Sequence, residues 1–183
     1  MFVAYRGGTM QINVAPALKM QGTPLEFKFS ITSSELELKK LPFEINSEIS
    51  IKGDCVYTGE NFIVKGLIVT DYTSRCDRCT KPVTGRLELS FMEEYASHED
   101  ENHPDRYLYK GDDIIIDKMV KDNIYLGAPI QYLCSNDCRG LCPQCGADLN
   151  KTDCGCRVEQ MDDEVNNPFA VLKDMLRDDE EEV

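Results

Sequence analysis

The segment between Cys134 and Cys156 limits the folds open to this chain more than any other, because it holds six cysteines within 23 residues. An ordinary hydrophobic core does not need sulfurs at this density. Cys142-Pro-Gln-Cys145 has the form of a knuckle, a tight turn that points two sulfurs at one place. The following residue, Gly146, can adopt the positive φ that such a turn requires. The segment therefore has the signature of a metal site.

Three more cysteine pairs complete the pattern. In Cys154-Gly-Cys156 the two sulfurs face the same side if the segment is extended, because residues i and i+2 share a face. The spacing between this pair and the knuckle suits a tetrahedral site of four cysteines, which is typical of structural zinc. The remaining pairs are Cys134 with Cys138, and Cys76 with Cys79.

Eight cysteines in four pairs supply enough ligands for two zinc ions. We predict that one zinc ion is held by Cys142, Cys145, Cys154 and Cys156, and a second by Cys76, Cys79, Cys134 and Cys138. Cys55 is left over and is not assigned as a ligand. The alternative is a single zinc ion between Cys142 and Cys156, with the other pairs as free or redox-active thiols.

The length of 183 residues allows one domain, or one domain with an appended module. No run approaches the apolar length of a membrane span, and the N-terminus lacks the apolar core of a secretory signal. We therefore expect a soluble, cytoplasmic protein. In that reducing compartment, clustered cysteines are metal ligands rather than disulfides.

The net charge of −13 is spread unevenly, because residues 159–183 carry ten acids and two bases. Phosphate neutralisation drives broad nucleic-acid binding, so a basic partner fits this chain better than free RNA. The simpler alternative is that the acidic tail only keeps the protein soluble. A local exception surrounds the first cysteine pair, where four basic residues are offset by Asp77 alone and can contact phosphate. These are Arg75, Arg78, Lys81 and Arg86.

Alternating apolar and polar residues predict strands at 25–31, 48–57, 62–71 and 83–95, with a hairpin turn after Tyr57. The Cys76 pair then lies at the tip of a β-hairpin. A redox-active CxxC opens a helix instead, so this position disfavours redox chemistry. The strands should supply most of the core from Phe27, Phe29, Ile63, Val64, Leu67, Leu87 and Phe91.

Helices are predicted to be few and short. Residues 12–18 should form a short strand and then a turn or helical piece. Asp117 can cap a helix that Gly127 ends and that packs against the sheet. A second helix is predicted from Asn167 to Leu176, with an apolar face that either packs on the domain or docks to a partner.

The expected fold class is α+β, with a mainly antiparallel β domain, a few short helices and a zinc-ribbon-like cysteine cluster. Residues 1–9 should be a disordered extension that precedes a working start at Met10, and residues 10–133 the β-rich domain. Residues 134–158 should form the zinc-binding cluster, and residues 159–183 an acidic linker and the C-terminal helix.

No enzymatic motif accompanies the cysteines. The sequence holds no P-loop, no nucleotide-binding glycine fingerprint and no nucleophile elbow, and no histidine stands near the cysteines to act as a base. A zinc ion with four thiolate ligands has no open position for water or substrate. We therefore expect a protein that is not an enzyme and has no small-molecule substrate.

The chain resembles the bacterial YceD family, the large ribosomal RNA subunit accumulation proteins. The resemblance rests on the CxxC hairpin, on the string that runs from Cys134 through Gly-Leu-Cys142-Pro-Gln-Cys145-Gly to Asn150, and on Asn-Pro-Phe-Ala-Val-Leu-Lys near the C-terminus. It covers nearly everything from Met10 onward. It implies a role in the accumulation of 23S rRNA, and zinc that stabilises rather than acts.

The function expected from the resemblance is that of a non-enzymatic ribosome-biogenesis factor. Its partners would be one or more large-subunit ribosomal proteins, 23S pre-rRNA, or both. Two other classes stay open on the residues alone, namely a zinc-ribbon regulator of transcription and a thiol-redox protein that uses Cys55 and one CxxC. The charge distribution favours a basic ribosomal protein, held by the acidic tail with Phe169 and Leu172 as apolar anchors.

Overall fold

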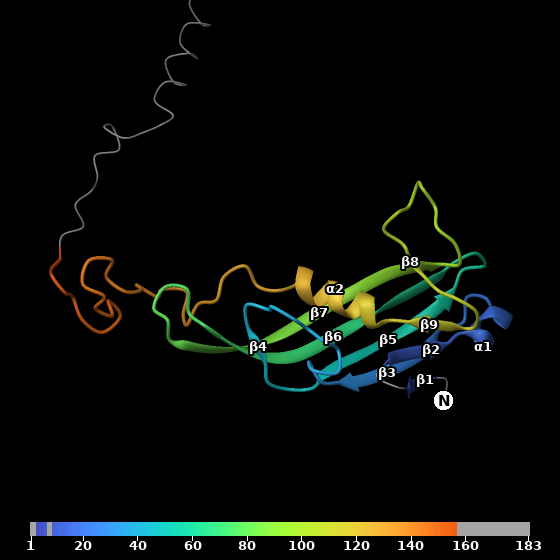
Figure 1. Ribbon diagram of the computed structural model, residues 1–183, viewed down its shortest axis with the longest axis horizontal. Coiled ribbons are helices and arrows are strands. Elements are labelled where there is room, and N and C mark those ends of the chain that lie inside the picture. The colour runs from blue at the N-terminus through green and yellow to red at the C-terminus, as the bar shows by residue number, and fades with distance from the viewer. Residues whose placement is uncertain (1–2, 7–8, 157–183) are drawn as a thin grey trace, which may run out of the picture. The chain divides into compact units, whose positions relative to one another are not determined.

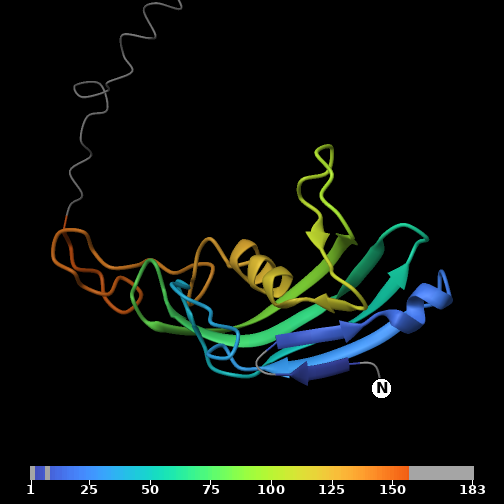
Figure 2. The same cartoon turned by 45° about the vertical axis from the view of Figure 1, so that its right-hand side comes forward.

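The computed structural model describes residues 3–6 and 9–156, and the chain divides into two compact units, residues 1–138 and 139–183. All helices and strands of the described residues lie in the first unit (Figures 1 and 2). In order they are β1 (Val3–Arg6), β2 (Thr9–Asn13), α1 (Ala15–Lys19), β3 (Leu25–Ile31), β4 (Glu44–Ile45), β5 (Ile49–Tyr57), β6 (Phe62–Arg75), β7 (Pro82–Ala96), β8 (Tyr107–Leu108), β9 (Asp113–Ile115) and α2 (Asp117–Leu126).

The first unit is built on a six-stranded sheet in the order β3-β5-β6-β7-β8, with β4 paired to β6. Every pair in it is antiparallel except the short contact between β7 and β8. A three-stranded sheet, β1-β2-β9, is also antiparallel. Figure 2 shows α2, β2 and β9 on the same side of the curved larger sheet. The predicted fold class is confirmed.

The strands follow the predicted alternation closely. β3 has the predicted bounds and buries every second residue, including Phe27 and Phe29. The core residues of α2 are Met119, Val120 and Ile124, which join the same cluster as the sheet residues. Packing of this helix on the sheet, as predicted, closes the core.

Two of the predicted core residues were wrong. Ile63 is only half-buried and Leu67 is 41% exposed, whereas Val64 and Ile68 on the same strand are fully buried. Successive strand residues point to opposite faces, so adjacent residues such as Ile63 and Val64 cannot both face the core. The other predictions were confirmed, and these are Phe27, Phe29, Val64, Leu87 and Phe91.

Two predictions near the N-terminus also need correction. Val3–Arg6 is a strand that pairs with β2, so the expectation of disorder over residues 1–9 fails there. Asp117 does not cap α2, because the N-cap is Ile116 and makes no side-chain cap. The Asp117 carboxylate instead accepts a hydrogen bond from the Met10 amide at 3.1 Å and joins β2 to α2.

The predicted C-terminal helix lies outside the described residues. No described helix has the length and apolar character needed to cross a membrane. The predicted division into four domains stays a prediction, although Cys134 and Cys138 group with the first unit.

Candidate metal centres

The first candidate centre, the hairpin tetrad, consists of Cys76, Cys79, Cys134 and Cys138. β6 ends at Arg75 and β7 begins at Pro82, so Cys76 and Cys79 occupy the tip of the hairpin, as predicted. The Cys76 amide donates to the Lys81 carbonyl at 2.8 Å, and the Thr80 amide donates to the Cys76 carbonyl at 2.8 Å. Thr80 has a φ of 59°, which closes the turn.

A pair of hydrogen bonds brings the distant half of the hairpin tetrad to the tip. The Asp77 amide donates to the Tyr132 carbonyl at 2.8 Å, and the Tyr132 amide donates to Asp77 Oδ2 at 2.7 Å. Arg78 Nη1 donates to the Cys138 carbonyl at 2.9 Å. These contacts fix the segment after α2 against the turn, and Cys134 follows Tyr132 by two residues.

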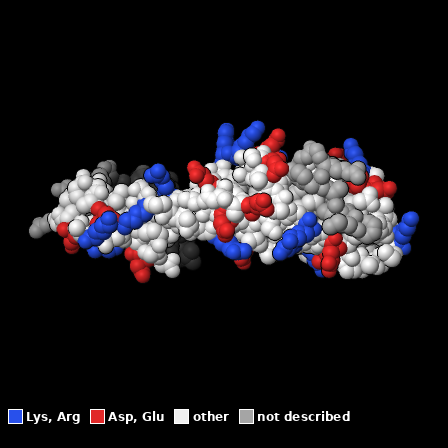
Figure 3. Space-filling view, turned by 90° about the horizontal axis from the view of Figure 1, so that it is seen from below, with Lys and Arg blue, Asp and Glu red and all other residues white. Residues whose placement is uncertain are grey.

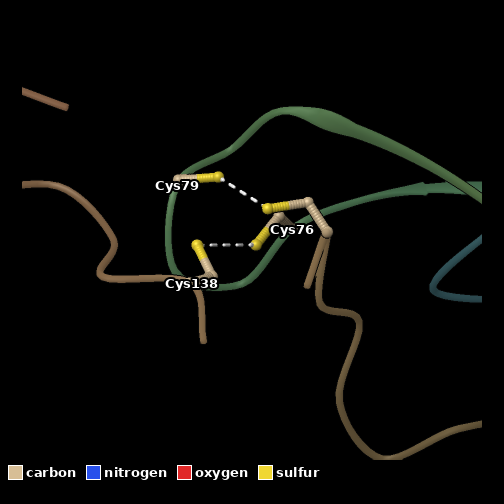
Figure 4. Close-up of side chains that lie close together, drawn as sticks. Cys76, Cys79 and Cys138 are labelled. Carbon is tan, nitrogen blue, oxygen red and sulfur yellow. Dashed lines mark hydrogen bonds between the residues drawn. The ribbon is translucent and has the colours of Figure 1, made fainter. Parts of the chain in front are cut away.

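The sulfur atoms of the hairpin tetrad lie at metal-binding separations. Sγ of Cys79 is 3.5 Å from Sγ of Cys134, Sγ of Cys76 is 3.8 Å from Sγ of Cys138, and all four lie within 4.8 Å of one another. A tetrahedral zinc site with Zn–S bonds of about 2.3 Å places its sulfurs about 3.8 Å apart. A disulfide would need about 2.05 Å. Figure 4 shows the labelled cysteines pointing toward one another.

The environment of the hairpin tetrad favours a thiolate at Cys76, whereas hydrogen bonds with the Cys79 and Cys138 thiols raise the pKa of Cys134 to about 12. Cys76, Cys79 and Cys138 are buried and pack with Val83. Burial opposes ionisation of Cys76, but backbone N–H groups, led by that of Cys134, lower the pKa of its thiol to about 6. Metal ligands must be deprotonated, so these N–H groups, from the turn and from Cys134, prepare Cys76 as a ligand.

The second candidate centre, the ribbon tetrad, consists of Cys142, Cys145, Cys154 and Cys156, whose sulfurs also lie within 4.8 Å of one another. Its knuckle repeats the bonding of the hairpin turn. The Cys142 amide donates to the Ala147 carbonyl at 2.8 Å, and the Gly146 amide donates to the Cys142 carbonyl at 2.9 Å. Gly146, with a φ of 72°, occupies the position of Thr80.

Backbone donors prepare a thiolate in the ribbon tetrad as well. The N–H groups of Cys145 and Gln144 lower the pKa of the Cys142 thiol to about 6. The second pair turns through Gly155, which has a φ of 66° between Cys154 and Cys156. Both knuckles therefore direct N–H groups at their first sulfur.

The ribbon around this tetrad has almost no apolar core. Leu141 and Asp148 pair as an isolated antiparallel β-bridge, and the Leu149 amide donates a hydrogen bond to the Gly140 carbonyl at 3.0 Å. These two contacts form a minimal hairpin. Within residues 139–156, Gly140 and Cys142 are the residues that are buried. So small an apolar core supplies little folding free energy, and a metal held by the four convergent cysteines could supply it.

Comparison with known proteins identifies the family. Residues 64–176 match the family described as "Large ribosomal RNA subunit accumulation protein YceD", and this range contains all eight cysteines of the two tetrads. The chain belongs to the YceD family. The match begins at residue 64 in β6 and includes all of β7 and the hairpin tip that carries Cys76 and Cys79.

Relatives of this YceD-family chain occur in several bacteria and a plant. An uncharacterized protein of Mycobacterium tuberculosis is 27% identical over 173 residues, 91% of this chain and 81% of the relative. The uncharacterized Bacillus subtilis protein YlbN is 27% identical over 160 residues, 85% of this chain and 91% of the relative. The Arabidopsis thaliana protein named "Large ribosomal RNA subunit accumulation protein YCED homolog 1, chloroplastic" is 34% identical over 68 residues, 37% of this chain and 21% of the relative. No solved structure matches.

The structure of this YceD-family protein brings the eight cysteines together in the two predicted groups, and zinc binding by them stays a prediction. Cys55 lies apart, fully buried in β5 among core residues, where burial raises the pKa of its thiol to about 12. Sequence reasoning missed the mutual bonds of Asp77 and Tyr132. Asp77 was interpreted only as a charge, and nothing in the local sequence pairs it with a residue 55 positions away.

Two of the predicted basic residues make contacts within the chain. Arg78 is engaged by the Cys138 carbonyl, and Arg86 forms an ion pair of 3.0 Å with Glu88. Figure 3 shows one face of the molecule, on which basic and acidic side chains are interspersed.

Proposed function

We propose that this YceD-family protein is a ribosome-biogenesis factor needed for accumulation of the 23S rRNA, and thus for assembly of the large subunit. The single observation that carries the proposal is the family match, because it spans both tetrads and the family is named for large ribosomal RNA accumulation. The Arabidopsis relative bears the same name. The protein acts by binding rather than by catalysis.

Both tetrads hold zinc in a structural role. Each offers four sulfur ligands, and a zinc ion with four thiolates has no open position for a reacting molecule. The hairpin tetrad fastens the segment from Tyr132 to Cys138 onto the tip of the β6–β7 hairpin. The ribbon tetrad replaces the apolar core that residues 139–156 lack. The bound metal therefore shapes surfaces for partners.

The partners are a basic large-subunit ribosomal protein, 23S pre-rRNA, or both, met in the cytoplasm. The net charge of −13 supports the protein partner, because it repels RNA at long range and attracts a basic protein. The engagement of Arg78 and Arg86 within the chain supports the same choice. The acidic residues 159–183 are the proposed docking segment, on the evidence of their sequence.

The test is a deletion of the gene in its own host, with large-subunit rRNA measured relative to small-subunit rRNA. We expect the ratio to fall and a copy of the intact gene to restore it. Cys76→Ser should restore it poorly, and Cys55→Ser, which leaves both tetrads intact, should restore it well. An unchanged ratio after deletion would contradict the proposed function.

A further inference from the structure

A groove of about 760 Å³ lies beside the hairpin tetrad in the first unit. The loop before β4 forms one side of it, the end of β6 and the start of β7 contribute the middle, and the segment after α2 forms the other side. Its main lining residues are Pro42, Phe43, Arg75, Pro82, Ile130 and Tyr132. Neither the fold nor the proposed metal sites account for this groove.

The groove combines a closed aromatic base with an exposed aliphatic wall. Phe43 and Tyr132 are 5% and 6% exposed, and their rings lie 5.1 Å and 5.7 Å from that of Tyr72 between centroids. Ile130, in contrast, is fully exposed, and nearby in sequence Leu126 is 87% exposed. Pro42, Pro82 and Ile130 are exposed and line the groove together, and such a contiguous apolar surface is typical of a binding site for protein.

The same features argue against an RNA base in the groove. A nucleobase is bound by stacking on an accessible ring face. Here the rings of Phe43 and Tyr132 are buried, and they pack on each other with centroids 6.1 Å apart. The accessible wall offers Ile130 and Pro129, which suit an aliphatic or aromatic side chain from a protein.

The hairpin tetrad fixes one wall of the groove. The Tyr132 amide donates a hydrogen bond to the Asp77 carboxylate, and the Tyr132 carbonyl accepts one from the Asp77 amide. Asp77 lies between Cys76 and Cys79. Two residues beyond Tyr132 comes Cys134, whose sulfur is 3.5 Å from that of Cys79. Loss of metal from this tetrad would therefore release the wall that carries Ile130.

Charge selects the occupant. The charged residues that line the groove, Glu44, Arg75 and Asp77, have a net charge of −1, and residues 1–158 carry −5. A second copy of this acidic chain is therefore repelled, and so is the acidic segment 159–183. A basic protein is attracted by the same charge. We propose that the groove receives an apolar side chain of a basic ribosomal protein, and that metal in the hairpin tetrad keeps the groove open to it. This inference rests on the proposed function and adds the contact surface.

The test is site-specific photo-crosslinking with the full-length protein. Ile130 is replaced by the photoreactive residue benzoylphenylalanine, and Met92 is replaced in a matched control. Met92 is 72% exposed and apolar, but it does not line the groove. The probes are total protein extracted from large ribosomal subunits and, separately, total rRNA. We expect position 130 to crosslink a basic ribosomal protein and position 92 to give no such product.

Substitutions sharpen the test. Ile130→Asp should weaken binding of the crosslinked protein at least about tenfold, and Met92→Asp should have little effect. Cys76→Ser should abolish the crosslink from position 130, whereas Cys142→Ser should leave it, because the groove is lined only by residues of the first unit. A Cys142→Ser variant that loses the crosslink as fully as Cys76→Ser would overturn the link to the hairpin tetrad.

Several results would overturn the groove's assignment. One is equal crosslinking from positions 130 and 92. Another is a crosslink from position 130 that reaches only RNA, a second copy of the protein or the same chain. The third is no crosslink at all from position 130. The rRNA ratio of cells that carry Ile130→Asp or the deletion separates the two claims. A fall after deletion without a crosslink would refute the groove and leave the proposed function standing.

Discussion

A reciprocal exchange at the two knuckles would test whether their equivalence has energetic meaning. Thr80 and Gly146 occupy the same position of the same turn, with φ values of 59° and 72°. A β-branched residue rarely adopts positive φ, because its Cβ meets the backbone. We expect Thr80→Gly to tighten metal binding at the hairpin tetrad and Gly146→Thr to weaken it at the ribbon tetrad.

The expected magnitude follows from two opposing effects. The left-handed conformation costs a residue with a Cβ about 1–2 kcal/mol, and a glycine costs about 0.5–1 kcal/mol in the more flexible metal-free state. The balance is about 0.5–1 kcal/mol, or about two- to fivefold in the metal dissociation constant. Thr80 is exposed, and a Cβ added at Gly146 meets no atom within 4 Å, so packing contributes little to either change.

The assay is competition for zinc against a chromophoric chelator, with one tetrad disabled at a time. Thr80→Gly is measured in a chain that carries Cys142→Ser and Cys154→Ser, and Gly146→Thr in a chain that carries Cys76→Ser and Cys79→Ser. Weaker binding after Thr80→Gly, or unchanged binding after Gly146→Thr, would refute the equivalence of the two turns.

Three further predictions concern the first unit. Ile68→Ala should lower the free energy of unfolding, measured by urea denaturation, by about 2–5 kcal/mol. The neighbouring Leu67→Ala should lower it by about 0.5 kcal/mol or less, because only Ile68 is buried. Equal losses would contradict the register of β6. Asp117→Ala should cost about 1–3 kcal/mol, because the Met10 amide loses its acceptor, and amide hydrogen exchange at Met10 should accelerate. Burial raises the pKa of the Asp117 carboxyl, so the contribution of Asp117 to stability falls as pH rises through that raised pKa. Asp117→Asn should therefore flatten this part of the stability–pH curve. A curve that does not change would contradict the raised pKa. Cys55→Ser should leave the zinc content unchanged and lower stability by about 1–3 kcal/mol, because a hydroxyl replaces a thiol in the core; lost zinc would make Cys55 a ligand.

Much of the fold could be predicted because its signals are local. The alternation in Leu25–Ile31 specifies one strand and its buried face without any partner. Adjacent apolar residues in β6 removed that signal, since Phe62, Ile63 and Val64 fit either face equally well. Only pairing with β5 and β7 decides which face meets the core. The error at Ile63 and Leu67 came from this ambiguity.

The cysteine groups could be predicted from spacing, but not what holds the hairpin tetrad together. Ligand spacing within each pair is fixed by a turn of a few residues. The link between Asp77 and Tyr132 depends on how the chain returns from α2. The local sequence marks neither its backbone hydrogen bond nor the one that the Asp77 carboxylate accepts from the Tyr132 amide. The groove next to Ile130 arises from the same return and was likewise not foreseen.

The most direct test of the two-centre account is the zinc count of the intact protein by native mass spectrometry, after preparation without chelator. The account predicts two zinc ions in the wild-type chain and one in each of Cys76→Ser and Cys142→Ser. A wild-type chain with no zinc would contradict it. So would a Cys142→Ser chain that retains both ions, because the ribbon tetrad would then not be a separate metal centre.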